Sequence, residues 1–198
     1  MNESGKGRPR DPNIDAAVVN AALDVLAERG FSRFTVEQVA LLAGVGKASI
    51  YRRFADKDAL IAHALDHVND DLPPVPDEGS VHERLSLMMN RARAAIPTSR
   101  AWRIMRHVVS ESTDSPHLVQ DFYRRVMHPR GDRIRSVLNQ AKARGELPVG
   151  FDVELAIPAL IGPMVFLITW AGCEQIDAMS TEDVVALVLS GLSRASDL

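Results

Sequence analysis

The feature that most constrains the fold of this chain is a tight turn at residues 43–46 between two short helical patterns. The first pattern begins at Thr35, which is expected to form a capping box with Gln38, and the second covers about residues 47–53. Gly44 permits the left-handed backbone that such a sharp turn needs. Apolar residues of both patterns recur at spacings that would pack one helix against the other: Val39, Ala43, Val45, Ile50 and Phe54. The sequence therefore predicts a helix-turn-helix.

The exposed side of the second helix would present hydrogen-bond donors, most of them cationic: Lys47, Ser49, Tyr51, Arg52 and Arg53. An α-helix is narrow enough to enter the major groove, where such side chains meet phosphates and base edges. We therefore expect double-stranded DNA as a partner; the alternative is a helical hairpin with solvated charges. Residues 44–47 are not a phosphate-binding loop, because they lack the required first glycine and a Ser or Thr after the lysine.

Helical patterns also fill the rest of the chain, at about residues 11–30, 56–70, 80–96, 100–112, 117–144, 152–172 and 181–195. Pro129 is expected to kink the longest of them and Gly145 to end it. Ser180 with Asp183 is typical of a capped start for the last helix. No segment alternates as a strand does, so the predicted fold class is all-α.

A proline-rich break divides the chain. Residues 72–79 hold three prolines and a glycine, a composition that cannot continue a helix. We place the domain boundary there, with residues 1–72 as an N-terminal arm and helix-turn-helix domain, 73–79 as a linker, and 80–198 as a second helical domain.

Composition indicates a soluble protein of the cytoplasm. The net charge is −3, and Cys173 is the single cysteine, which excludes an internal disulfide. Residues 155–173 carry no charge and approach the length of a membrane span. They also contain Pro158, Gly162 and Pro163, so a buried interface helix kinked near Gly162 is the favoured interpretation, and no membrane is expected as a partner.

Residues 14–60 resemble the DNA-binding domain of the TetR (tetracycline-repressor-like) family. The residues that carry the resemblance are Ala22 through Gly30-Phe31, Thr35, Val39-Ala40, Ala43-Gly44-Val45, Ile50-Tyr51-Arg52, Phe54, Lys57 and Leu60. Two positions depart from the family pattern. Gly46 stands where the family usually has Ser or Thr, so the second helix is expected to lack a side-chain cap, and Ala48 stands where Gly is common.

The resemblance implies a role for each matching position. Thr35 would meet a phosphate, while Lys47, Ala48 and Ser49 would approach base edges. Tyr51, Arg53 and Lys57 would mainly bind phosphates. Arg52 would bind either a phosphate or a base edge. Phosphate contacts set position and affinity, whereas base contacts set sequence preference.

The N-terminal arm carries a second signal. Arg8 and Arg10 flank a proline in a short basic segment, and such an arm can enter a narrow, A·T-rich minor groove. The alternative is a solubilising terminus with no partner.

The C-terminal half resembles one branch of the family's regulatory domains, at residues 141–147 and 160–163. This resemblance implies a homodimer joined through the last two long helices and an unknown small-molecule effector bound among the middle helices. The candidate lining residues are Met88, Met89, Trp102, Met105, Phe122, Met127 and Trp170. Methionines and aromatic residues suit an adaptable apolar cavity, although each of them is also a common core residue.

We therefore expect a transcriptional regulator, a repressor that an effector releases from a palindromic operator. The alternatives are a ligand-independent or activating regulator, a purely structural helical dimer, and a metal-dependent helical enzyme that uses His63 and His67, which lie four residues apart. No catalytic or cofactor motif is present, so we expect neither an enzyme nor a cofactor.

Overall fold

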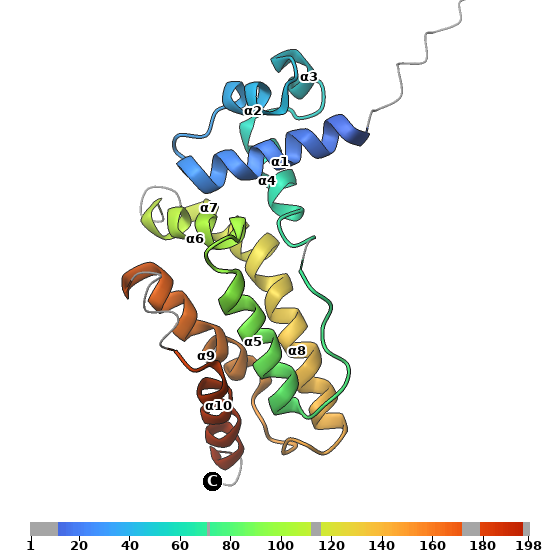
Figure 1. Ribbon diagram of the computed structural model, residues 1–198, viewed down its shortest axis with the longest axis vertical. Coiled ribbons are helices and arrows are strands. Elements are labelled where there is room, and N and C mark those ends of the chain that lie inside the picture. Colours follow the sequence, from blue (N-terminus) through green and yellow to red (C-terminus); the bar gives the residue numbers. More distant parts are fainter. Residues whose placement is uncertain (1–11, 71, 112–115, 172–178, 196–198) are drawn as a thin grey trace, which may run out of the picture.

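The computed structural model describes residues 12–70, 72–111, 116–171 and 179–195. Every regular element in these four ranges is helical, as predicted. Four helices form one end of the elongated molecule, and the longer helices fill the other end (Figure 1).

The first group comprises α1 (Pro12–Arg29), α2 (Val36–Ala43), α3 (Lys47–Tyr51) and α4 (Lys57–Asp66). Their shared core is apolar and tightly closed around Leu26, Val39 and Ile50. Helix α4 ends four residues before the predicted position. Asn69 explains the early end, because its side-chain amide donates to the Val126 carbonyl (3.0 Å) and its Oδ1 accepts from Arg130 (2.7 Å), which draws the chain toward the second group.

The second group comprises α5 (Val81–Ala95), α6 (Arg100–Glu111), α7 (Pro116–Phe122), α8 (His128–Ala143), α9 (Val153–Phe166) and α10 (Thr181–Ala195). Helices α5 and α8 run side by side along the molecule, with α9 and α10 packed beside them (Figure 1). The predicted helix 117–144 is interrupted by a π-helical turn, η1 (Tyr123–Met127), immediately before His128-Pro129. Proline has no N–H to donate, and the interruption of the helix beside Pro129 takes the form of this wider turn.

A second π-helical turn, η2 (Leu167–Ala171), follows α9. Thr169 Oγ1 donates there to the Val165 carbonyl at 2.7 Å, so a side chain satisfies a backbone acceptor of the widened turn. The predicted helix ends at Gly145 and Ser180 are confirmed: Gly145 has a φ of 74°, and Ser180 Oγ accepts from the Asp183 N–H at 3.1 Å.

The segment 72–80 between α4 and α5 contains no helix or strand and runs back along α5 and α8 (Figure 1). An extended stretch of this length spans roughly 25 Å, about the length of the fifteen-residue α5. The segment forms no helix or strand, and its prolines have no N–H groups, so its backbone carbonyls are open to donors from side chains. Three arginines supply the donors: Arg133 to Pro73, Arg91 to Pro74 at 3.4 Å, and Arg84 to Pro76 at 2.8 Å.

Helix α6 fastens the two groups together. The Arg100 guanidinium binds both oxygens of Asp24 on α1 (2.7 and 3.2 Å) and the Asn20 side chain (2.8 Å). At the other end of α6, the Glu111 carboxylate accepts from the backbone N–H groups of Phe31 and Ser32 (3.2 and 2.8 Å). One end of α6 therefore holds α1 and the other holds the turn that follows α1, so a shift of α6 would be transmitted to the first group of helices.

Candidate nucleic-acid interface and ligand cavity

The turn between α2 and α3 has the predicted geometry. Thr35 and Gln38 form the complete capping box, with Thr35 Oγ1 accepting from the Gln38 N–H at 3.3 Å and Gln38 Oε1 accepting from the Thr35 N–H at 3.1 Å. Gly44 has a φ of 67°, which a residue with a Cβ rarely adopts. Gly46 precedes α3 without a side-chain cap, as its departure from the family pattern predicts.

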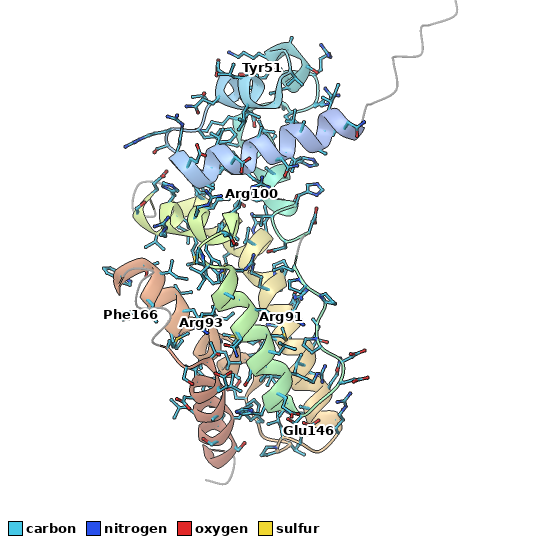
Figure 2. The ribbon with its side chains drawn as sticks, in the orientation of Figure 1. Tyr51, Arg91, Arg93, Arg100, Glu146 and Phe166 are labelled. Atoms are coloured by element: carbon cyan, nitrogen blue, oxygen red, sulfur yellow. The ribbon has the colours of Figure 1, made fainter. Side chains whose placement is uncertain are left out.

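One face of α3 is directed outward at the end of the molecule, where Tyr51 lies (Figure 2). The exposed side chains on this face belong to Lys47, Ala48, Tyr51 and Arg52. Ile50, on the opposite face, is buried against the core. The apolar residues predicted to join α2 to α3 all pack into that core, so burial of one face fixes which side chains the other presents.

Two of the cationic residues of α3 and its C-terminal end, Lys47 and Arg53, are bonded to carboxylate or hydroxyl groups of the same chain. Lys47 forms an ion pair with Glu37 of α2, and this hydrogen bond raises the pKa of Lys47 and lowers that of Glu37. Arg53 is half-buried: its Nε lies 2.6 Å from Asp15 of α1, and its Nη1 donates to Ser49 Oγ at 2.6 Å. Arg53 therefore braces α3 against α1.

Arg52 differs from its neighbours. Its side chain makes no hydrogen bond or ion pair with any other residue that the structure describes. A guanidinium on the exposed face is thus available to an external acceptor.

Lys57, the first residue of α4, contacts the segment between α1 and α2. Its Nζ donates to the Phe31 carbonyl at 2.8 Å and sits 5.9 Å from the centre of the Phe34 ring. Its ammonium retains two further donors. Arg8 and Arg10 lie outside the described residues.

A cavity of about 150 Å³ lies among the linker, α5, α6, α8 and α9. Four of the seven residues predicted to line an effector site line this cavity: Met88, Met89, Trp102 and Met127. Met105 and Phe122 are buried in the core and do not line it. Trp170 is 76% exposed and borders a separate hollow with Met127 and Ile161.

The cavity also has polar residues that the sequence analysis did not identify. Arg91, Arg130, Arg133 and Ser99 line it together with the apolar side chains. The i, i+3 spacing of Arg130 and Arg133 predicts that they lie on one face of a helix. Only the packing of α8 against the linker shows that this face lines the cavity.

His63 and His67 lie side by side, with ring centres 4.9 Å apart. His67 Nδ1 is 2.9 Å from Asp70 Oδ2, and the His63 ring packs 5.2 Å from that of Phe54. Within the described ranges, no group of three or more His, Cys, Asp or Glu is placed to hold a metal ion. Both histidines border a polar hollow of about 910 Å³ between α1, α4 and α6.

One helical stretch of the described chain, Val153–Trp170, is long and apolar enough to cross a membrane by length and composition alone. A core helix of a soluble protein satisfies the same criterion. Several large apolar side chains here are exposed, and Phe166 lies on the outer side of α9 (Figure 2).

Comparison with known proteins identifies similar sequences over nearly the whole chain. Residues 18–64 match the family model described as "Bacterial regulatory proteins, tetR family", and residues 75–188 match "Tetracyclin repressor-like, C-terminal domain". The HTH-type transcriptional regulator YdeS of Bacillus subtilis is 31% identical over 195 residues, which cover 98% of this chain and 97% of YdeS. The DNA-binding transcriptional repressor TetR of Mycobacteroides abscessus is 32% identical over 153 residues, 74% and 77% of the two chains.

A solved structure, described as a TetR-family transcriptional regulator from Mesorhizobium loti, superposes with a TM-score of 0.74. It covers 93% of this chain, and this chain covers 98% of it, at 19% identity. A likeness at this identity shows the fold alone.

Proposed function

Because this chain belongs to the TetR family of bacterial DNA-binding transcriptional regulators, we propose that it is a repressor which a small molecule releases from a palindromic operator. The observation that carries the proposal is the outward face of α3, where exposed donors surround a side chain, Arg52, without a described partner. A helix presented in this way docks in the major groove. Such a protein acts in the cytoplasm, where the chromosome lies.

The proposed operator contacts follow the exposed face. Lys47, Ala48 and Ser49 approach base edges, and Arg52 reaches either a base or a phosphate. The remaining contacts are to phosphates, from Thr35, Tyr51, Arg53 and Lys57, with Arg8 and Arg10 of the arm in the adjacent minor groove. Because Glu37 and Asp15 neutralise Lys47 and Arg53 in the free protein, phosphates must compete with these carboxylates, which reduces the affinity that these two contacts add.

The functional unit is a homodimer joined through α9 and α10. Large apolar side chains of α9, of the turn η2 that follows it and of α10 are exposed in the single chain: Leu155 and Phe166, Trp170 (76%), and Leu187 (72%). Several large apolar side chains exposed on neighbouring helices favour an interface there. A two-fold axis through it would place two α3 helices on one DNA face, which requires a palindromic operator.

The cavity is the proposed effector site. Arg91 and Arg133 line it and bond to the linker that leaves α4, and Trp102 on its wall belongs to α6, which holds α1. A ligand that prefers one arrangement of α6 and the linker therefore changes the spacing of the two α3 helices.

The decisive experiment measures binding of the purified protein to DNA from just upstream of its own coding region, with a salt titration and competitor DNA. We expect specific binding by a dimer, weakening steeply with salt. Binding that does not discriminate this DNA from competitor at any salt concentration would contradict an operator there.

Lys57→Ala is expected to weaken binding to every DNA sequence alike and to lower the slope of log K against log salt by about one unit per protomer. The physical reason is the loss of a phosphate contact that reads no base. Lys142→Ala is a matched control, because Lys142 Nζ also donates to a backbone carbonyl (Phe151, 3.0 Å) but belongs to the last turn of α8, and this end of α8 lies far from α3 (Figure 1). A change of sequence preference with an unaltered salt slope would show that Lys57 is not a phosphate contact.

A further inference from the structure

The cavity offers many hydrogen-bond donors and no acid. Of the described residues that line it, three are arginines, none is Asp, Glu or His, and most of the others are apolar. A site that selected a cation or a neutral polar molecule would need acceptors. The chemistry of these walls therefore favours a ligand that is apolar over most of its surface and negatively charged at one end.

Arg130 is one of the three arginines that line the cavity. It is half-buried, with its guanidinium 5.7 Å from the centre of the Trp102 ring and its Nε bonded to Asn69 Oδ1 at 2.7 Å. No described carboxylate forms an ion pair with it. Burial, and then the charge of Arg133, lower the pKa of Arg130 to about 10. A buried cation next to a like charge is costly unless an anion accompanies it.

Trp102 adds a second, independent observation. The residue is 4% exposed, lines the cavity, and its indole Nε1–H has no hydrogen-bond partner among the described residues. Buried donors are nearly always satisfied in folded proteins, so this orphaned donor, in a residue of the cavity wall, favours an acceptor from outside the chain.

The other two arginines are held by weak, neutral acceptors. Arg133 donates to the Pro73 carbonyl and Arg91 to the Pro74 carbonyl at 3.4 Å. Arg91 lies on the side of α5 that faces the linker (Figure 2). A charged oxygen forms roughly twice as strong a hydrogen bond to guanidinium as a neutral one does. An anion in the cavity would therefore compete with the linker for both side chains.

The volume of the cavity limits the size of the apolar part of the ligand. A cavity of about 150 Å³ holds a body the size of benzene, which has six carbon atoms. Methionines form much of the wall, and their flexible side chains accommodate a somewhat longer chain.

We propose that the cavity binds a medium-chain amphipathic carboxylate, with the carboxylate among Arg91, Arg130, Arg133 and the Trp102 N–H, and with an apolar body of about six to eight carbon atoms against Met88, Met127 and Met164. This inference rests on the proposed function only in calling the ligand an effector. Binding would draw Arg91 and Arg133 from the Pro73 and Pro74 carbonyls and so loosen the segment that leads out of α4.

The test titrates the unaltered dimer with octanoate and with octanamide, which have the same shape but differ in charge, by isothermal titration calorimetry without DNA. We expect octanoate to bind once per protomer and octanamide to bind at least about tenfold more weakly. Equal affinity for the two compounds, or no binding of octanoate at millimolar concentration, would overturn the proposal. This comparison needs no variant and so does not depend on the folding of one.

Two substitutions locate the site. Arg130→Gln should weaken octanoate binding at least about tenfold and leave octanamide binding almost unchanged, so that the preference for charge disappears. Arg106→Gln is the matched control, since Arg106 is an exposed arginine of α6 that does not line the cavity, and it should retain the preference. Full preference for octanoate in a folded Arg130→Gln variant would overturn the placement of the carboxylate.

A DNA-binding measurement with octanoate present separates this inference from the proposed function. Weaker operator binding supports both. Charge-selective octanoate binding with unchanged operator affinity supports the ligand class and counts against release of the repressor by this ligand.

Discussion

Arg52→Glu is expected to lower operator affinity by about a thousandfold at moderate salt. Two unit charges 4 Å apart interact by roughly 1 kcal/mol in water, so turning an attraction into a repulsion changes the binding free energy by about 2 kcal/mol per protomer. A two-fold dimer makes the contact twice, which gives about 4 kcal/mol, a factor of about a thousand. The side chain is exposed and has no described partner, so the fold should be unaffected.

The measurement is a mobility-shift or fluorescence-anisotropy titration with operator DNA, accompanied by a thermal melt of the variant. Arg144→Glu is the control, because it makes the same change of net charge at an exposed position beside Glu146, at the far end of the molecule (Figure 2). Full operator affinity in Arg52→Glu would show that the outward face of α3 is not the DNA-binding surface.

Arg84→Ala is expected to lower the free energy of unfolding by about 3 kcal/mol. Arg84 is 1% exposed, donates to the Pro76 carbonyl at 2.8 Å and donates to Gln140 Oε1 at 2.7 Å. The substitution removes both bonds and leaves a hole where α5, α8 and the linker meet. The linker would lose its deepest attachment, although its sequence is unchanged.

Urea denaturation at one fixed protein concentration measures this effect, since dimerisation makes stability depend on concentration. Arg91→Ala is the comparison, because Arg91 also donates to a linker carbonyl but is exposed and its bond is longer, 3.4 Å. Its loss should cost less than about 0.5 kcal/mol. Similar costs for the two variants would show that burial of Arg84 contributes little to its role.

Structural features that depend on three or four neighbouring residues were predicted correctly. The Thr35–Gln38 capping box, the left-handed Gly44 and Gly145, and the Ser180 cap are all present, because each depends on residues that are neighbours in the chain. The absence of a cap at Gly46 is equally local, since glycine has no side chain to donate or accept. Helical periodicity similarly identified Lys47, Tyr51 and Arg52 as exposed, whereas Ser49 and Arg53, predicted on the same face, are half-buried and bonded to each other.

One helix boundary differs because distant residues decide it, and one predicted helix contains a turn of a different form. Helix α4 ends early where the Asn69 amide bonds to Val126 and Arg130, about sixty residues away. The helix predicted over residues 117–144 contains η1, where a π-helical turn accommodates Pro129. Sequence patterns showed that Pro129 would disturb the helix, but they did not specify the form of the disturbance.

The candidate ligand site shows the same division. Composition selected apolar residues as its lining, and four of the seven line the cavity. Met105 and Phe122 instead fill the core, and nothing in their local sequence distinguishes these two roles. The arginines were overlooked because a charged residue on a predicted helix is usually solvated. Arg130 and Arg133 become half-buried only when α8 packs against its neighbours and the linker, and Arg91 of α5 stays exposed at the edge of the cavity.

By itself, the sequence determined an all-α chain with a helix-turn-helix at residues 35–53, a proline-rich break, and the outward donors of α3, since these follow from backbone preferences and helical period. Only the tertiary structure decided which groups those donors and the other cationic side chains contact. Asp15 braces Arg53, Arg100 and Glu111 tie α6 to α1 and to the turn after it, and Arg91, Arg130 and Arg133 converge on one cavity beside the linker. These groups lie far apart in the chain, and their charges become neighbours only because apolar burial brings their helices together.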